Sequence, residues 1–215
     1  MTVAIIDYGS GNLRSVAKAF ERVADGRKIT VTSSPADIIA ASHIVLPGVG
    51  AFADCMQGLR DLPGMLEALS QQVLEHKKPF LGICVGMQML FEKGHEHGIH
   101  AGLGWLRGEV IGIKESASQS PTPNPQSLKV PHMGWNDLTL HGNHPLLNGI
   151  ASGAHAYFVH SYHAQCRDAS DVIATVEYGQ TITAALARGN IMGTQFHPEK
   201  SQETGLRLLK NFLVY

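Results

Sequence analysis

The strongest structural signal in the chain is the sequence Pro79-Phe80-Leu81-Gly82-Ile83-Cys84-Val85-Gly86-Met87-Gln88. Its apolar run stops at Cys84, a glycine flanks the cysteine two residues away on each side, and a helix-like stretch follows. A residue that turns sharply between a strand and a helix needs small neighbours and a backbone that tolerates strain. The pattern therefore predicts a nucleophile elbow with Cys84 at its tip.

A base and a carboxylate follow far downstream, in Gln195-Phe196-His197-Pro198-Glu199. Because alternate residues of an extended chain share a face, and Pro198 favours an extended backbone at His197, the imidazole and the Glu199 carboxylate can meet. His197 would take the proton of Cys84 and return it to the leaving group, while Glu199 would hold the ring in the right tautomer. Taken alone, His-Pro-Glu is equally consistent with a surface turn. Together with Cys84 it predicts a cysteine hydrolase.

Two further features would assist the thiol. A cysteine at the start of a helix meets unpaired backbone N–H groups and the positive end of the helix dipole, which favour the thiolate. The sequence Pro47-Gly48-Val49-Gly50 follows an expected strand and should open beside the elbow, where the N–H groups of Val49 and Val85 would bind the oxyanion. Without the elbow, such a loop is more often an ordinary turn.

The first half of the chain alternates short apolar runs with helical patterns, as βαβ folds do. The expected strands are Val3 to Ile6, Ile29 to Thr32, His43 to Leu46 and Pro79 to Ile83. Helices are expected around the apolar stripe of Leu13, Val16, Ala17 and Phe20, after Ser34-Pro35, and over Leu62 to His76. This order predicts a mostly parallel sheet with helices on both faces.

The second half is richer in strands. They are expected over Leu103 to Ile113, Trp135 to Leu140, Tyr157 to His160, Val172 to Val176, Thr181 to Ala187 and Ile191 to Phe196, before a closing helix from Gly205 to Val214. Glu177-Tyr178-Gly179-Gln180 predicts a hairpin, and Ser116 to Lys129 a solvated loop. The predicted fold class is therefore α/β, a single doubly wound domain with a central, mostly parallel sheet and an additional antiparallel portion.

Composition narrows the class of protein. The chain has 215 residues, 44% of them hydrophobic, which suits one domain with a two-sided sheet. A net charge of -1 with interspersed signs favours neither nucleic acid nor a membrane, so we expect a small-molecule substrate or a protein partner. The start of the sequence lacks the basic leader of a signal peptide, and no apolar run approaches the length of a membrane span. Three cysteines at unrelated spacings argue against a disulfide framework. Together these features predict a reducing, cytoplasmic location.

Other candidate sites are weaker. Of twelve histidines, the densest group lies in Gly94-His95-Glu96-His97-Gly98-Ile99-His100, whose spacing matches no zinc site and whose glycines predict a mobile, solvated loop. Tyr8-Gly9-Ser10-Gly11-Asn12 lacks the lysine and spacing of a phosphate loop, so a tight strand-to-helix turn is expected. Cys55 and Cys166 are expected to be buried as small hydrophobic residues. We expect neither a metal nor a cofactor.

Taken together, Gly82-Ile83-Cys84-Val85-Gly86-Met87-Gln88 and His197-Pro198-Glu199-Lys200 resemble the triad motifs of class I glutamine amidotransferases, in the same order and at a similar separation. Within that family, three segments resemble the branch of imidazole glycerol phosphate synthase glutaminase subunits: Asp7 to Val16, Pro131 to Asn136 and Tyr157 to Tyr162. The resemblance spans most of the chain and implies a single glutamine amidotransferase type 1 domain over residues 1–215.

The resemblance implies that Cys84 attacks the side-chain amide of glutamine, forms a γ-glutamyl thioester and releases ammonia, after which water releases glutamate. Carried over position by position, substrate binding would fall to Gly50, Gln88, Glu96, Ser161 and Tyr162. A carboxylate and an amide suit the α-ammonium group of the substrate, although Gln88 would otherwise be a solvated helix residue and Glu96 an ordinary loop acid. His163 departs from the aromatic or basic residue of many relatives, which concerns partner contacts rather than catalysis.

Ammonia released into water at neutral pH is mostly protonated and no longer nucleophilic, so it needs a dry passage to a second active site. This chain has no room for that site. The resemblance implies a heterodimer with a cyclase subunit, a (β/α)8 barrel, that makes imidazole glycerol phosphate and aminoimidazole carboxamide ribotide in histidine biosynthesis. Asn12, Trp135, Tyr157 and Lys200 match interface positions, and the two aromatic residues would anchor the partner unless they pack into the chain's own core.

Three alternatives stay open at this stage. The chain could serve another synthase, in the pyridoxal phosphate, purine or anthranilate pathway, with the same triad and a different acceptor. A cysteine peptidase-like hydrolase would use the elbow of Cys84 without a glutamine pocket around Gln88. A binding or regulatory module would keep the turn and lose catalysis, which the presence of Cys84, His197 and Glu199 argues against.

Overall fold

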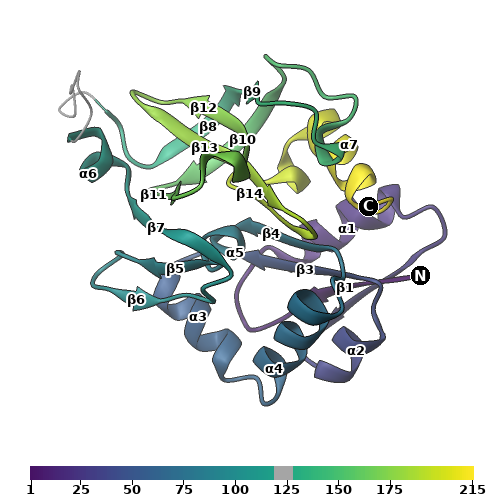
Figure 1. Ribbon diagram of the computed structural model, residues 1–215. Helices are drawn as coiled ribbons and strands as arrows, with labels where there is room; N and C mark the ends of the chain where they lie inside the picture. The colour runs from purple at the N-terminus through teal and green to yellow at the C-terminus, as the bar shows by residue number, and fades with distance from the viewer. Residues whose placement is uncertain (119–127) are drawn as a thin grey trace.

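The computed structural model describes residues 1–118 and 128–215 and has an α/β fold (Figure 1). Its largest sheet has eight strands in the order β2-β1-β3-β4-β14-β13-β12-β9. The bounds are β1 (Thr2–Ile6), β2 (Lys28–Thr32), β3 (His43–Gly48), β4 (Phe80–Cys84), β9 (Thr139–Leu140), β12 (Val172–Glu177), β13 (Thr181–Arg188) and β14 (Ile191–Thr194). Strands β2, β1, β3, β4 and β14 pair in parallel, and β13, β12 and β9 add antiparallel pairs.

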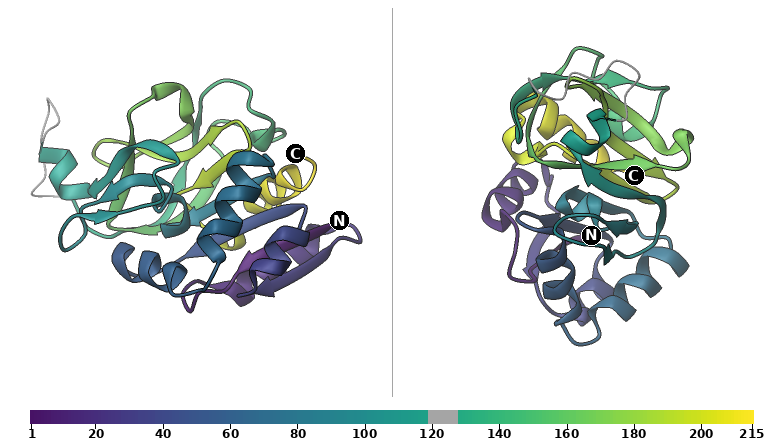
Figure 2. Two further views of the ribbon diagram at one scale, coloured as in Figure 1. Left: turned by 60° about the horizontal axis from the view of Figure 1, so that its bottom comes forward. Right: turned by 90° about the vertical axis from the view of Figure 1, so that its left-hand side faces the viewer.

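Helices pack on both faces of this sheet, as the βαβ pattern predicts. The α-helices are α1 (Leu13–Val23), α2 (Pro35–Ala40), α3 (Phe52–Arg60), α4 (Met65–Ser70), α5 (Val85–Gln88), α6 (Ile113–Ser118) and α7 (Gln202–Phe212). The described residues also include a π-helical segment, η1 (Gln71–Glu75), and the 3-10 turns η2 (Pro145–Leu147), η3 (Ala169–Asp171) and η4 (Pro198–Lys200). Helices α1 and α7 pack together on one face, and α2, α3 and α4 cover the other (Figure 2). Within the described ranges, every helix is too short or too polar to cross a membrane.

Two smaller sheets complete the antiparallel half of the chain. One pairs β8 (His132–Asp137) with β10 (His155–His160). The other has the order β11-β7-β5-β6, with bounds β5 (Phe91–Gly94), β6 (His100–Ala101), β7 (Leu106–Gly112) and β11 (Tyr162–Cys166). Only Ser161 separates β10 from β11, so the chain passes from one small sheet to the other at that residue.

The predicted element types are largely confirmed, including the hairpin between β12 and β13, and one expectation is wrong. The histidine-rich segment forms the turn between β5 and β6, and His97, Gly98 and Ile99 are exposed there, as expected. Its ends are held in place, because Gly94 pairs with His100 and the His95 ring lies 2.7 Å from the Glu109 carboxylate. The expected loop from Ser116 to Lys129 begins as the end of α6, where Ser116 is buried. The remainder of that loop, residues 119–127, lies outside the described residues.

The glycines around Cys84 allow α5 to pack tightly against the sheet. A Cβ atom at Gly82 would lie 2.6 Å from the carbonyl oxygen of Gly86, and a Cβ at Gly86 would overlap the carbonyl oxygen of Leu46 in β3. No side chain fits at either position without moving the backbone. The glycine spacing therefore reflects close backbone contact between β3, β4 and α5.

We predict that Gly86→Ala lowers the free energy of unfolding by about 2 kcal/mol, because the added methyl group forces β3 and α5 apart. Gly112→Ala is the matched control, since its nearest neighbour is the flexible Glu115 carboxylate at 3.4 Å. The control should change stability by less than about 0.5 kcal/mol. Urea unfolding of both variants tests this, and equal effects would contradict the packing argument.

Candidate active site

Cys84 occupies a strained turn between β4 and α5. Its backbone has φ +54° and ψ -111°, in a region that residues with a side chain seldom adopt, and it is 3% exposed. The pairing of β3 with β4 places Gly48 opposite Cys84, so the loop from Pro47 to Gly50 opens beside the elbow as predicted. The helix that follows has only one turn, so its dipole is smaller than that of a long helix.

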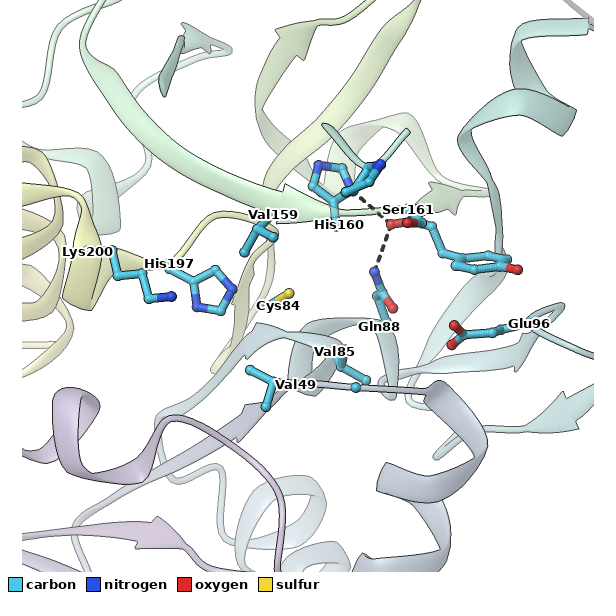
Figure 3. Close-up of a pocket in the computed structure, with 13 residues that line it drawn as sticks. Val49, Cys84, Val85, Gln88, Glu96, Val159, His160, Ser161, His197 and Lys200 are labelled. Carbon is cyan, nitrogen blue, oxygen red and sulfur yellow. Dashed lines mark hydrogen bonds between the residues drawn. The ribbon is translucent and has the colours of Figure 1, made fainter. Parts of the chain in front are cut away.

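A cavity of about 320 Å³ opens at this turn (Figure 3). It is lined by Val49, Gly50, Cys84, Val85, Gln88, Glu96, Pro131, Val159, His160, Ser161, Tyr162, His197 and Lys200. All five residues predicted to bind substrate are present, as are both predicted oxyanion residues. The volume is in the range of small-molecule sites. The sequence analysis assigned no role to Pro131, Val159 or His160.

His197 and Glu199 meet as the sequence predicts. Nδ1 of His197 lies 2.8 Å from Oε1 of Glu199, and both side chains are almost fully buried. Because a carboxylate accepts the hydrogen bond, the proton is on Nδ1, and Nε2 faces the cavity side where Figure 3 shows Cys84. The amide of Asn12 also donates to Oε1 of Glu199, at 3.4 Å.

The environment of His197 favours its charged form. Burial by itself lowers the pKa of this ring, but interactions with Cys84 and Glu199 outweigh burial and raise the pKa to about 10. Nε2 forms no hydrogen bond to a protein atom, so we attribute the effect of Cys84 to the charge of its thiolate rather than to a formed bond. At neutral pH these interactions favour the imidazolium form of His197 beside the sulfur of Cys84.

Gln195 is a residue of the site that sequence reasoning missed. It is fully buried, and its Nε2 atom donates to Sγ of Cys84 at 3.6 Å. Its Oε1 atom accepts from Nε2 of Gln88 at 3.0 Å, and Gln88 also donates to the carbonyl oxygen of Tyr162 at 2.9 Å. Gln88 is 3% exposed, which excludes the alternative that it is only a solvated helix residue. The sequence did offer one signal for Gln195, since it is a polar residue near the end of the strand predicted over Ile191 to Phe196.

Three side chains anchor the loop next to the elbow. The Tyr8 hydroxyl donates to the carbonyl oxygen of Pro47 at 2.7 Å, and burial raises the pKa of this phenol, which keeps the donor protonated. The carbonyl oxygen of Val49 accepts from the hydroxyl of Ser10 and, at 3.4 Å, from Sγ of Cys55. Cys55 is buried as expected, and it also positions this loop. The peptide group between Gly48 and Val49 thus lies between two carbonyl groups, those of Pro47 and Val49, that are each held by a hydrogen bond from a side chain.

Glu96 is held at the opposite end of the cavity. Its Oε2 atom accepts a hydrogen bond from the backbone N–H of Phe52, the first residue of α3, at 2.7 Å. An acceptor at this position satisfies an N–H group that the helix itself leaves unpaired. The carboxylate therefore has a fixed place in the cavity wall, which an ordinary loop acid would not have.

Three of the four predicted interface residues adjoin His197 or Glu199: Asn12 donates to Glu199, Tyr157 accepts from the His197 backbone N–H, and Lys200 follows Glu199 in sequence. Trp135 is 48% exposed, so it is not a core residue, and it packs edge-on against Tyr157 with ring centroids 5.9 Å apart. The Lys200 ammonium group lies 5.6 Å from the centre of the Tyr157 ring.

His163 is buried rather than at the surface. It is 3% exposed, and its Nε2 atom lies 2.8 Å from the hydroxyl of Ser116 in α6.

No three His, Cys, Asp or Glu side chains of residues 1–118 and 128–215 are grouped as a metal site would require. In the histidine-rich segment, His95 is paired with Glu109, which also forms an ion pair with Lys93 at 2.9 Å. The arrangement at Cys84 is instead suited to covalent chemistry on a carbonyl compound. It combines a buried nucleophile, a charged imidazole with an orienting carboxylate, and a cavity for a small polar molecule.

The raised pKa of His197 predicts a pH-dependent stability. A group whose pKa is higher in the folded state stabilises the fold below its ordinary value of 6.5, and this contribution is lost as pH rises towards 10. Urea unfolding between pH 6.5 and 10 should show this decline in the parent. It should be shallower in Glu199→Gln, which removes one cause of the shift. Glu203→Gln, at an exposed position, is the control, and a Glu199→Gln profile as steep as the parent's would contradict the assignment.

Comparison with known proteins agrees with the geometry. The family model for class I glutamine amidotransferases matches residues 4–215. The chain is 53% identical to imidazole glycerol phosphate synthase subunit HisH of Rhodospirillum rubrum, covering 99% of this chain and 98% of that protein. It is 51% identical to the HisH subunit of Agrobacterium fabrum, with the same two coverages.

Solved structures share the fold at low sequence identity. A crystal structure of a glutamine amidotransferase superposes with a TM-score of 0.72 at 17% identity, covering 99% of both chains. The structure of PurLQS from Thermotoga maritima gives a TM-score of 0.69 at 20% identity, covering 100% of this chain and 98% of that chain. With its nucleophile elbow, its cavity and matches over nearly its full length, this chain belongs to the class I glutamine amidotransferase family.

Proposed function

We propose that this chain is the glutaminase subunit of an imidazole glycerol phosphate synthase and acts in histidine biosynthesis. The observation that supports this most directly is the gathering of Cys84, His197, Gln88 and Glu96 around one cavity at a nucleophile elbow. The full-length similarity to HisH subunits supports the branch. The chain would function as a single domain over residues 1–215, in the cytoplasm and without a metal or cofactor.

In the proposed reaction, the thiolate of Cys84 attacks the side-chain carbonyl carbon of glutamine. The N–H groups of Val49 and Val85 stabilise the resulting oxyanion. As the intermediate collapses, the C–N bond breaks and the His197 imidazolium gives its proton to the leaving nitrogen, which departs as ammonia. His197 then takes a proton from water, the hydroxide attacks the γ-glutamyl thioester, and glutamate leaves as the Cys84 thiolate is restored. Glu199 stabilises the charged ring throughout.

The polar groups of the cavity suit the two charged ends of the amino acid. The Glu96 carboxylate, fixed by α3, and the Gln88 amide oxygen would hold the α-ammonium group. Backbone groups at Gly50, Ser161 and Tyr162 would hold the α-carboxylate, since a carboxylate accepts from N–H donors. A peptidase would have no use for a buried Gln88 and a fixed Glu96 in one small cavity.

The partner would be a cyclase subunit with a (β/α)8 barrel, bound as a one-to-one heterodimer. It would dock over Asn12, Trp135, Tyr157 and Lys200 and receive ammonia before water protonates it. The contact of Asn12 with Glu199 would couple docking to the triad. We further expect the isolated chain to be a weak glutaminase, with the loop from Pro47 to Gly50 holding an inactive amide orientation until the ligand of the partner binds.

A glutaminase assay tests the function and the nucleophile together. The chain mixed with the cyclase subunit and its phosphorylated ligand should convert glutamine to glutamate, whereas Cys84→Ala should be inactive and still bind the cyclase. Cys166→Ala is the control and should keep its activity, because burial raises the pKa of Cys166 to about 11 and Cys166 does not line the cavity. Turnover by Cys84→Ala would disprove the nucleophile assignment. Strong hydrolysis without the partner would disprove the proposed loop inhibition.

The docking surface makes a separate prediction. Trp135→Ala should weaken the affinity for the cyclase subunit about tenfold or more, because exposed aromatic anchors dominate interface energies. Ile39→Ala is the comparison, since this 52% exposed residue lies on α2, away from the triad. Titration calorimetry of both variants with the cyclase measures the difference. Parent-like affinity for Trp135→Ala would argue against docking over this surface.

A further inference from the structure

A chain of hydrogen-bonded side chains runs from β8 to the glutamine cavity. Nδ2 of Asn136 lies 3.2 Å from Nε2 of His132, and Nδ1 of His132 lies 3.0 Å from Nε2 of His160. Nδ1 of His160 lies 2.9 Å from the carbonyl oxygen of Tyr162. The exposed side of the same strand carries Met133 and Trp135. None of the three polar residues has a role in the reaction described above.

The Tyr162 carbonyl determines the direction of every bond in this chain. A carbonyl oxygen can only accept, so His160 must carry its proton on Nδ1. In a neutral ring, Nε2 of His160 is then an acceptor and must receive a proton from Nδ1 of His132. By the same argument, Nε2 of His132 accepts from the amide of Asn136. That amide also donates to the carbonyl oxygen of Glu177 at 3.0 Å, which identifies the Asn136 nitrogen.

The same carbonyl directs the bonds on the other side, towards the nucleophile. Figure 3 shows His160 and Gln88 approaching one oxygen beside Ser161, which is that of Tyr162. The Gln88 atom that faces it must be nitrogen. The second proton of that nitrogen points to Gln195, which must therefore present its oxygen, and Gln195 is left to direct its own N–H at Sγ of Cys84.

Both histidines are buried and neutral. Burial lowers the pKa of His160 to about 3 and that of His132 to about 4, so neither ring is charged at neutral pH. The His132 ring is stacked between Phe158 and Tyr178, with centroids 4.7 Å and 4.0 Å away. Because neither proton nor ring can rearrange without breaking a buried hydrogen bond, the directed chain has one stable arrangement.

We infer that His160 and His132 are positioning residues for glutamine recognition. They hold the Tyr162 carbonyl in the place from which it orients the amide of Gln88 and, through Gln88, that of Gln195. The inference rests on the proposed function, in which the Gln88 oxygen meets the α-ammonium group of glutamine. With the amide reversed, Gln88 would turn an NH2 group towards that cation. The pair would also link the strand bearing Trp135 to the substrate cavity.

Histidine tautomers test this inference without any assay of activity. The complex of the chain with the cyclase, labelled with ¹⁵N-histidine, should show both His132 and His160 protonated at Nδ1, whereas the Nε2–H form is the commoner one in neutral histidine. Finding the proton of His160 on Nε2 would overturn the inference and leave the glutaminase function untouched. A parent complex that does not hydrolyse glutamine would instead refute the function.

Kinetics of variants in the same complex measure the consequence. His160→Leu removes the donor and should raise the KM for glutamine about tenfold. His160→Asn places an amide N–H where the histidine has Nδ1 and should stay within about threefold of the parent. A merely structural role would lower the active fraction, and so kcat, at unchanged KM. A parent-like KM for His160→Leu, or equal losses in both variants, would overturn the inference.

A second variant decides the result if His160→Leu does not fold. His132→Phe preserves the stacking on Phe158 and Tyr178, but it removes the donor to His160 and the acceptor of the Asn136 amide. Nε2 of His160 is then left unpaired in a buried site, which weakens the hold of His160 on the Tyr162 carbonyl. It should therefore raise the KM for glutamine as well. An unchanged KM in a folded His132→Phe complex would exclude a role for this pair.

Discussion

Cys84 turns from strand to helix within one residue and has a positive φ, while the backbones of β3, β4 and α5 pack closely around it. Helix α5 can approach β3 only because Gly86 has no side chain that would meet the Leu46 carbonyl. Cys84, at the end of β4, and His197, which follows β14, then line the same cavity. The strain at one residue is maintained by packing spread over three elements, which makes it stable in the folded state.

Around this turn, the site depends on buried polar groups, several of which are paired with distant parts of the chain, as Gln88 is with Tyr162 and Gln195. Leaving one buried donor or acceptor unpaired costs about 1–3 kcal/mol, so each bond constrains the next. The Glu199 carboxylate keeps the His197 ring oriented and charged, and Gln195 directs an N–H at the sulfur. The nucleophile is therefore prepared electrostatically before substrate arrives, which is the condition for stabilising a developing charge without reorganisation.

Local patterns were sufficient for the elbow, for the pair His197 and Glu199, and for the alternation of strands and helices in the first half, because each depends on neighbours in sequence. They failed for the end of α6. There serine suggested solvent, whereas the His163 ring from another segment lies against the buried Ser116 side chain. Polarity predicts exposure only where no such partner exists.

Glycine spacing and hydrophobic periodicity specified which residue is the nucleophile and what kind of sheet presents it, since steric limits on a tight turn act over a few residues. Folding in three dimensions decided that Gln88 is buried, that Gln195 touches the sulfur, and that His132 and His160 share a directed hydrogen bond. These contacts join residues far apart in the chain, and hydrogen-bond direction depends on which acceptor lies opposite each donor, which only the folded arrangement defines.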